Sequence, residues 1–312
     1  MSQSLDIVFM GTPDFACASL KAIHESGHKV KMVITAPDRP AGRGKKLRSS
    51  SVKLMAEDLK LPLLQPTNLK DPKFVAQLRN VKADLFVVVA FRMLPEVVWS
   101  MPPKGTINLH GSLLPDYRGA APINWAILNG DSQTGVSTFF IEKEIDTGDV
   151  IQQESLPIGP DENAGDVHDR MMILGASTLV STIDKIADGT AKGIDQAEFE
   201  SSPKRPAPKI FKPDCEINWH QSAESVHNHV RGLSPYPTAW SMVSEHSFKV
   251  FKGRVGEMNL LNPGAYRIID GRLFMGTKTH DYEILDLQLA GKKRMSTDVF
   301  LRGMSHVFEA KG

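Results

Sequence analysis

The chain has 312 residues, of which 41% are apolar and 23% charged, with 37 basic and 36 acidic side chains. This composition excludes disorder, collagen and coiled coil as the main architecture, and the length indicates two domains or one large one. Residues 1–200 carry a net charge of −4 and residues 201–312 a net charge of +5. The two parts are therefore expected to meet different partners, although chance also produces such differences in a long chain.

The first half of the chain alternates short apolar runs with helical patterns. It predicts strands at 7–10, 30–35, 85–90 and 106–109, and helices at 13–27, 51–60 and 71–79. The run 85–90 is apolar throughout, as a strand covered on both faces should be. This βαβα order predicts an α/β domain, in which a Rossmann-like, mostly parallel sheet has helices on both faces.

The second half changes character after one long predicted helix. Strands are expected at 136–141 and 150–156, and the helix at 167–187, before a Pro- and Lys-containing stretch that reads as a linker. Beyond it the sequence predicts a helix at 222–231 and short strands at 239–243, 248–251, 265–269, 272–275 and 282–289. Closely spaced strands with glycine turns predict a small barrel or sandwich. The predicted division is a first domain at 1–189, a linker at 190–212 and a second domain at 213–312.

The cysteine content and the hydropathy pattern predict a cytoplasmic protein. Cys17 and Cys215 lie far apart and neither belongs to a C-x-x-C pair, so neither a disulfide framework nor a zinc site is predicted. Residues 1–6 contain no basic region followed by an apolar run, so no secretory signal is expected. The longest apolar run, 85–91, is too short to span a membrane.

The densest group of chemically useful residues lies in the segment 107–123. Asn108 and His110 are two positions apart on a predicted strand, so their side chains share one face. They stand at the carboxyl end of that strand, where open α/β sheets place their ligands. An amide and an imidazole together can polarise a carbonyl and stabilise the oxyanion formed on attack. An isolated Asn-x-His more often only satisfies the backbone of the following loop.

A carboxylate further along the chain favours a catalytic role for Asn108 and His110 over a structural one. Asp146 lies in a Glu-Ile-Asp-Thr-Gly-Asp segment between two predicted strands, where a tight turn could present it to a pocket. A hairpin turn with solvated acids is the plain alternative. An aspartic protease would need a second Asp-Thr-Gly loop, and this chain has none.

The loop 36–48 holds five basic side chains and one acid, with two glycines and two prolines. A cationic loop of this kind suits contacts with phosphate groups. A solvated surface loop is the competing interpretation.

Together these segments resemble the 10-formyltetrahydrofolate-dependent formyltransferases. The Asn108-x-His110 pair, the loop 112–115 and Asp146 match that family's motif in order and spacing. The resemblance is strongest to the bacterial type that acts on methionyl-tRNA. It extends over nearly the whole chain, through the segments 9–16, 117–123, 208–210, 217–219 and 231–237.

The resemblance implies a reaction and roles for three residues. The α-amine of methionine, esterified to initiator tRNA, would attack the formyl carbon of 10-formyltetrahydrofolate, the cosubstrate. Asn108 and His110 would hold the oxyanion, and Asp146 would help remove the proton, directly or through water, and orient His110. No metal is implied.

The resemblance also implies binding residues. The folate would contact Met93 and Leu94 and the loop formed by Ser112, Leu113, Leu114 and Pro115, and the tRNA would contact Arg43, Lys45, Lys209 and Lys212. Many members have Tyr-Gly where this chain has Phe91-Arg92, which leaves the folate contacts there less defined. The second domain would be an OB-like barrel that binds tRNA, with Tyr236 and Trp219 in its core. A monomer without membrane contact is expected.

Four other functions remain open from the sequence. A formyltransferase acting on a small amine, such as an amino-sugar or glycinamide, or a hydrolase of the formyl-folate would keep the same three residues. A nucleotide-binding oxidoreductase would need the Gly-x-Gly-x-x-Gly that is missing after the first strand. A non-catalytic RNA-binding protein would not need Asn108, His110 and Asp146 together.

Overall fold

A computed structural model of the chain describes residues 3–41, 46–199 and 205–308. The backbone divides into two compact units, and neither is one continuous segment. The first contains residues 1–119, 135–156 and 168–206, and the second contains 120–134, 157–167 and 207–312. The predicted segments 1–189, 190–212 and 213–312 therefore differ from the compact units, because two short pieces of the first segment group with the C-terminal part.

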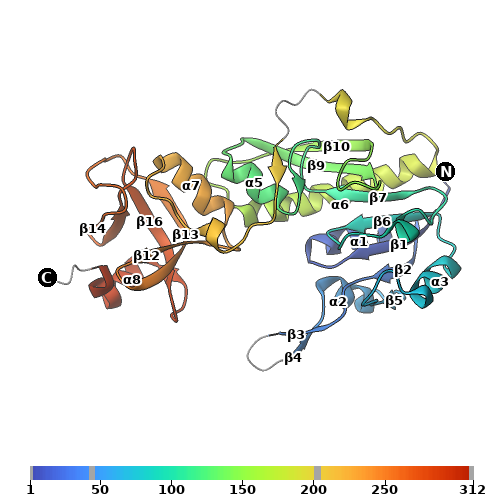
Figure 1. Ribbon diagram of the computed structural model, residues 1–312, viewed down its shortest axis with the longest axis horizontal. Coiled ribbons are helices and arrows are strands. Elements are labelled where there is room, and N and C mark those ends of the chain that lie inside the picture. The colour runs from blue at the N-terminus through green and yellow to red at the C-terminus, as the bar shows by residue number, and fades with distance from the viewer. Residues whose placement is uncertain (1–2, 42–45, 200–204, 309–312) are drawn as a thin grey trace. The chain divides into compact units, whose positions relative to one another are not determined.

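The first unit is built on a seven-stranded sheet with the order β10-β9-β7-β6-β1-β2-β5 (Figure 1). The pairs β1–β2, β1–β6, β2–β5 and β6–β7 are parallel, whereas β9 runs antiparallel to β7. Its strands are β1 (Asp6–Gly11), β2 (Lys29–Ile34), β5 (Leu63–Leu64), β6 (Leu85–Val89), β7 (Thr106–His110), β9 (Gln133–Phe140) and β10 (Val150–Pro157). The carboxyl ends of the five parallel strands share one edge, where α/β sheets carry their ligand sites.

One face of this sheet is covered by α3 (Pro72–Asn80) and α4 (Glu96–Trp99). Val8 and Met10 of β1 point to this face and share a buried cluster with Phe74, Leu78 and Val98. The alternation along β1 follows from the two-residue period of a strand. The helix predicted at 71–79 is therefore α3, and its buried residues pack against this face.

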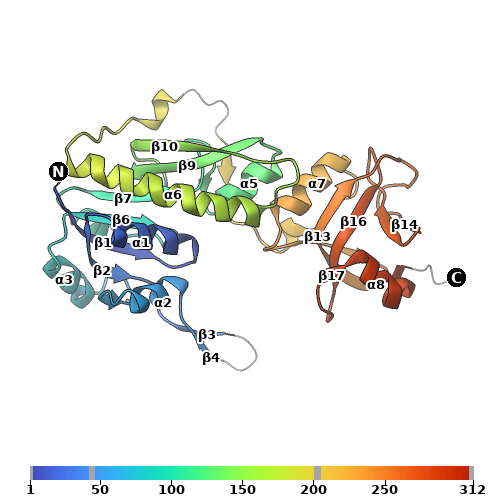
Figure 2. The ribbon, with the colours of Figure 1, turned by 180° about the vertical axis from the view of Figure 1, so that it is seen from behind.

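The opposite face is covered by α1 (Phe15–Glu25) and α6 (Ala164–Ala187), which lie on the near side of the sheet in Figure 2. Gly175 of α6 lets the helix approach β7, since a Cβ at this position would lie 2.8 Å from a methyl carbon of Leu109. The hydroxyls of Thr138 and Thr182 join β9 to α6 at 2.8 Å. Helices on both faces of a mostly parallel sheet confirm the predicted α/β class.

The remaining elements of the first unit are short apart from one helix. They are β3 (Arg39–Ala41), β4 (Lys46–Arg48), α2 (Ser51–Asp58), β8 (Arg118–Gly119), η1 (Gln196–Glu198) and β11 (Pro206–Ala207), whose last residue belongs to the second unit. β3 and β4 pair antiparallel at the base of the predicted cationic loop. Arg43 and Lys45, the two tRNA contacts predicted in that loop, lie outside the described residues.

The second unit contains an antiparallel sheet with the order β12-β13-β16-β15-β14, and β17 pairs with β16. Its elements are α5 (Pro122–Leu128), η2 (Pro213–Cys215), α7 (Ala223–Gly232), β12 (Ala239–Val243), β13 (His246–Val255), β14 (Tyr266–Ile269), β15 (Arg272–Met275), β16 (Tyr282–Leu289), β17 (Met295–Ser296), α8 (Thr297–Met304) and η3 (Ser305–Phe308). α7 and η3 contribute to the same apolar core as the strands. The predicted C-terminal β domain is confirmed, while α5 and α8 were not predicted.

Residues 120–134 group with the second unit because α5 bonds to it. The Asn124 amide donates to the carbonyl of Gly232 at 2.7 Å, and the Trp125 indole donates to that of Pro208 at 2.8 Å. These partners lie more than 80 residues away in the sequence, so a pattern read along the chain does not reveal them. No helix in the described part of the chain is both long and apolar enough to cross a membrane.

The aromatic residues of the second unit divide between core and surface. Trp219 is buried, as predicted, and its indole donates to Ser241 Oγ at 2.9 Å. The prediction that Tyr236 packs in the core is wrong, since its side chain is 82% exposed. It sits on a turn closed by a hydrogen bond from Thr238 N to Leu233 O, which leaves the tyrosine at the tip.

Glu283 is a buried carboxylate that two exposed arginines hold on β16. Arg272 Nε donates to Oε1 at 2.7 Å and Arg254 Nε donates to Oε2 at 2.6 Å. The hydrogen bonds from Arg272 and Arg254 hold the pKa of Glu283 below its usual range, although burial opposes them. Because this pKa is lowered in the folded state, the ionised carboxylate stabilises the fold above the ordinary glutamate pKa of about 4.3. That stabilisation is lost as the pH falls through the lowered pKa.

We therefore expect Glu283→Gln to destabilise the protein by about 1–3 kcal/mol at pH 7, because the arginines lose an ionised acceptor. Chemical unfolding followed by near-UV circular dichroism measures the difference. The loss of stability caused by Glu283→Gln should shrink as the pH falls below about 4. Glu245→Gln, at an exposed site of the same unit, should change the stability little at any pH. A Glu283→Gln deficit that stays constant with pH would refute this account.

Candidate active site

The site begins on β7, which lies between β6 and β9. Asn108 stands beside Val88 of β6 and Phe139 of β9, and His110 stands beside Ser137 of β9. Asn108 and His110 therefore share the face of the sheet on which Val88 packs, as their spacing predicted. Both lie at the carboxyl edge of the strand.

His110 is buried, with 6% of its surface exposed. Its Nε2 lies 2.8 Å from the carbonyl oxygen of Tyr117. A carbonyl can only accept, so Nε2 must carry a proton and donate it. The other ring nitrogen, Nδ1, is consequently the one that can take up or deliver a proton.

Asp146 lies on the loop between β9 and β10 and faces that nitrogen. Its Oδ2 is 3.8 Å from His110 Nδ1 and accepts a hydrogen bond from Gly119 N at 3.0 Å. The 3.8 Å separation is too long for a direct hydrogen bond but leaves the two groups in electrostatic contact. Two residues 36 positions apart in the sequence are thus neighbours at the sheet edge.

The Asp146 loop has a strained and closely packed backbone. Asp146 has φ +55, in the left-handed region that costs most residues energy and that short polar side chains tolerate best. Gly148 is required by space, because a Cβ there would lie 1.8 Å from the carbonyl oxygen of Phe140. Such strain persists only where the surrounding structure holds it, and it is common at functional sites.

The turn 116–119 supplies the backbone groups of the site. Tyr117 has φ +61 and Gly119 has φ +126, and this sharp turn directs the carbonyl of Tyr117 to His110 and the N–H of Gly119 to Asp146. Arg205 supports the turn, since its carbonyl accepts from Tyr117 N at 2.6 Å and its guanidinium lies 4.6 Å from the tyrosine ring centre. The Nη2 atom of Arg205 also donates to Asp116 Oδ2 at 3.0 Å.

The residues predicted to meet the folate occupy two places. In the loop after β7, Ser112, Leu114 and Pro115 are buried and Leu113 is half-buried. The Ser112 hydroxyl donates to the carbonyl of Asp116 at 2.6 Å, so it fixes the loop itself.

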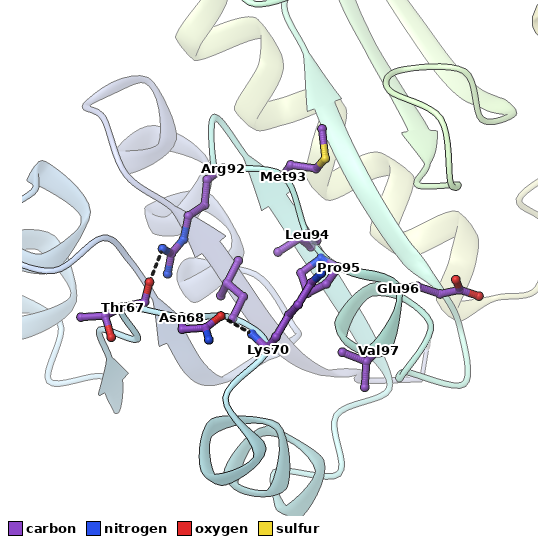
Figure 3. Close-up of a pocket in the computed structure, with 10 residues that line it drawn as sticks. Thr67, Asn68, Lys70, Arg92, Met93, Leu94, Pro95, Glu96 and Val97 are labelled. Carbon is purple, nitrogen blue, oxygen red and sulfur yellow. Dashed lines mark hydrogen bonds between the residues drawn. The ribbon is translucent and has the colours of Figure 1, made fainter.

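Met93 and Leu94 line a pocket of about 590 Å³, formed by the segments 67–70 and 92–97 (Figure 3). The first segment follows β5 and the second follows β6, and both strands are parallel to β1. The pocket therefore opens at the same edge of the sheet that carries Asn108. Met93 is 71% exposed whereas Leu94 is buried, so the pocket has an apolar floor and an exposed apolar side chain at its rim.

Arg92, which departs from the Tyr-Gly pattern, is held in place beside this pocket. Its guanidinium donates to the carbonyl of Thr67 at 2.9 Å (Figure 3) and also to that of Pro66. It also lies 5.7 Å from the ring centre of Phe91. Burial and the nearby Arg39 lower the pKa of Arg92 from its usual value. The arginine thus closes one side of the pocket by joining its two segments.

The predicted tRNA contacts lie elsewhere in the chain. Lys209 and Lys212 belong to the second unit and are exposed. The Lys209 ammonium lies 5.3 Å from the ring centre of Phe211, and that of Lys212 lies 5.8 Å from the ring centre of Trp240. Among the residues that the structure describes, no three His, Cys, Asp or Glu side chains gather as a metal site would require.

The sequence missed one residue of this site, Gln196. It lies in the segment that the sequence assigned to a linker, yet only 1% of its surface is exposed. Its amide donates to the carbonyls of Asp146 and Gly148 at 3.0 and 2.8 Å. A periodic pattern in the sequence does not identify such a residue, because its hydrogen bonds go to distant backbone atoms and to one arginine.

Comparison with known proteins places the chain in a family. Two family models match it, "Formyl transferase" over residues 5–183 and "Formyl transferase, C-terminal domain" over residues 209–305. The methionyl-tRNA formyltransferase of Bacteroides fragilis is 51% identical, with 99% of this chain and 97% of the relative aligned. The one of Porphyromonas gingivalis is 48% identical, with 97% of each chain aligned.

A solved structure shows the same fold. HypX from Aquifex aeolicus, in complex with tetrahydrofolic acid, superposes with a TM-score of 0.68 at 16% identity, covering 99% of this chain and 48% of that one. The fold, the two matching family models and the full-length identity agree. The chain belongs to the family of the methionyl-tRNA formyltransferases.

Proposed function

We propose that the protein transfers a formyl group from 10-formyltetrahydrofolate to the α-amine of methionine on initiator tRNA, in the cytoplasm. One observation carries the proposal. In a chain that matches methionyl-tRNA formyltransferases over its full length, Asn108, His110 and Asp146 converge at the carboxyl edge of the sheet. An amide, an imidazole and a carboxylate in this part of the fold support an attack on a carbonyl carbon.

In the proposed reaction the amine nitrogen forms a bond to the formyl carbon while the carbonyl electron pair moves to oxygen. The Asn108 amide and the His110 ring stabilise that oxyanion. Asp146 accepts the proton that the amine loses, directly or through water. The tetrahedral intermediate then collapses to the new formamide, the bond from carbon to N10 of the folate breaks, and that nitrogen takes up the proton that Asp146 accepted.

Tyr117 and Gly119 prepare these side chains for the reaction. The Tyr117 carbonyl accepts a hydrogen bond from Nε2 of His110, so Nδ1 is the ring nitrogen that can face the reacting atoms. The Gly119 N–H holds one oxygen of Asp146 and leaves the carboxylate's other oxygen for the amine. Groups that are already oriented do not have to reorganise as charge develops, which is the main source of electrostatic catalysis.

We place the folate along the loop 91–95, with Met93 and Leu94 against its apolar surface and Leu113 beside the reacting end. The pocket fits such a ligand because it is mainly apolar and lies on the sheet edge that carries Asn108. Pockets for small molecules usually combine apolar walls with a few fixed polar groups. The backbone of residues 91–95 and 112–115 would supply those groups.

Lys209 and Lys212, with Arg43 and Lys45, are proposed to contact the tRNA backbone. Lys209→Ala should raise KM for methionyl-tRNA several-fold with little change in kcat, because one phosphate contact is lost. Each contact contributes about one unit to the slope of log affinity against log salt concentration. The slope should therefore fall by about one unit in the variant.

Steady-state kinetics at several salt concentrations measure this effect. Lys82→Ala is the matched control, because Lys82 is exposed and precedes β6 at the amino end, away from the sheet edge that carries the site. An unchanged salt slope in Lys209→Ala would remove Lys209 from the tRNA contacts.

The test of the function offers different acceptors together with labelled 10-formyltetrahydrofolate. The acceptors are methionyl-tRNA, an amino-sugar nucleotide, a glycinamide and water alone. We expect label on methionyl-tRNA, with a kcat/KM far above that for the small amines. Label on a small amine alone, or formate released at the same rate without any acceptor, would contradict the proposal.

A further inference from the structure

Gln196 joins three separate pieces of the candidate site. It begins η1 and follows Ile194, which forms an antiparallel bridge with Val150 at the start of β10. The bridge has two hydrogen bonds of 2.9 Å and holds this segment beside the Asp146 loop. Asp195 caps η1 by accepting from Ala197 N at 2.8 Å. The backbone that carries Gln196 is therefore fixed on both sides of the residue.

The buried amide of Gln196 uses all its hydrogen-bonding capacity on the site. Its two N–H groups donate to the carbonyls of Asp146 and Gly148, and its oxygen accepts from Nε and Nη2 of Arg118 at 2.9 and 2.5 Å. The opposite amide orientation would set an oxygen against two carbonyls and an NH2 against a guanidinium. The partners therefore determine the orientation.

These bonds fix the two segments that meet at the Asp146 carboxylate. On one side, Gln196 holds the carbonyl of Asp146 itself, at the residue whose φ is +55. On the other side, it holds Arg118, whose neighbour Gly119 donates to Asp146 Oδ2. A strained conformation lasts only while its surroundings enforce it, and Gln196 provides that restraint from both directions.

We propose that Gln196 is a positioning residue, which keeps the Asp146 carboxylate on the Gly119 N–H and directed at His110. The inference rests on the proposed function and adds a residue to it. Gln196 does not touch the reacting atoms, so it acts only through Asp146. A shift of about 1 Å in a reacting group costs on the order of 100-fold in rate.

The experiment compares Gln196→Met, which has a similar volume and no amide, with the wild-type enzyme in the methionyl-tRNA formylation assay. We expect kcat to fall about 10- to 100-fold while KM for methionyl-tRNA stays within twofold. Thr182→Val is the matched control, because it removes a buried hydrogen bond to Thr138 in the same unit, outside the candidate site. It should keep kcat close to the wild-type value.

Two further measurements separate positioning from a loss of fold. In an Asp146→Asn background, Gln196→Met should cost little more, since coupled residues are not additive. Independently of turnover, hydrogen exchange at the Gly119 amide should become faster in Gln196→Met, because the Asp146 carboxylate no longer protects it.

Gln196→Glu provides a pH test. Its carboxylate cannot donate to the two carbonyls, whereas its protonated form can donate once. Its activity relative to wild type should therefore rise as the pH is lowered. An unchanged kcat in Gln196→Met would overturn the proposal, as would Gly119 exchange equal to wild type. If the wild-type enzyme itself formylates no methionyl-tRNA, the proposed function fails instead, and the Gly119 exchange still decides the role of Gln196.

Discussion

Asp146→Asn should lower kcat for formyl transfer by about 10²- to 10⁴-fold, the usual contribution of a positioned proton acceptor. The amide oxygen of asparagine can still accept from Gly119 N, so the loop should keep its conformation. What the variant loses is the ability to take the proton from the attacking amine. KM for methionyl-tRNA should change little, since Asp146 lies at the sheet edge and binds none of the tRNA backbone in this account. Single-turnover kinetics with saturating enzyme measure the chemical step directly.

Glu144→Gln is the control for Asp146→Asn. It removes a negative charge from the same loop at an exposed position. The rate should stay near that of the wild type, which excludes a general effect of loop charge. A turnover of Asp146→Asn within a few-fold of the wild type would remove Asp146 from proton transfer.

His110→Ala is expected to lower kcat by about 10²- to 10³-fold, the usual cost of removing one oxyanion donor. The variant loses the imidazole ring proposed to meet the oxyanion, and it also removes the donor to the Tyr117 carbonyl. It leaves a small cavity as well, so some stability will be lost. The same single-turnover assay, with the unfolding midpoint measured in parallel, separates the two effects.

His28→Ala supplies the matched comparison, because His28 is a buried histidine of the same unit. Its Nδ1 accepts from Leu5 N at 3.2 Å and its Nε2 lies 3.1 Å from Asp184 Oδ1, on the face of the sheet covered by α6. The variant should lose stability and keep its turnover at a temperature where it is folded. If the two alanine variants lose turnover equally, His110 has no special role.

The sequence predicted those parts of the fold that depend on local pattern. The apolar run 85–90 became the buried strand β6, and the apolar run 7–10 became part of the buried strand β1. Asn108 and His110 share a face of β7 because strand geometry alone requires it. Asn108, His110 and Asp146 were grouped as a site through the family resemblance, whereas their contacts are known only from the structure.

The sequence could not reveal features that depend on distant backbone atoms. Gln196 lies in a segment that looks like a linker, because its partners are carbonyls some 50 residues earlier. The grouping of α5 with the second unit rests on bonds from Asn124 and Trp125 to residues far along the chain. Tyr236 reads as an apolar core residue, yet its turn leaves it exposed. Side-chain hydrogen bonds to distant main-chain atoms produce no periodic pattern in the sequence.

The most direct test of the central claim compares initiator with elongator methionyl-tRNA as acceptors of a labelled formyl group from 10-formyltetrahydrofolate. We expect formylmethionine on the initiator tRNA at a rate that Asp146→Asn reduces at least about 100-fold, and a much lower kcat/KM for the elongator. Absence of formylmethionine on either tRNA, with the folate bound and the protein folded, would contradict the central claim.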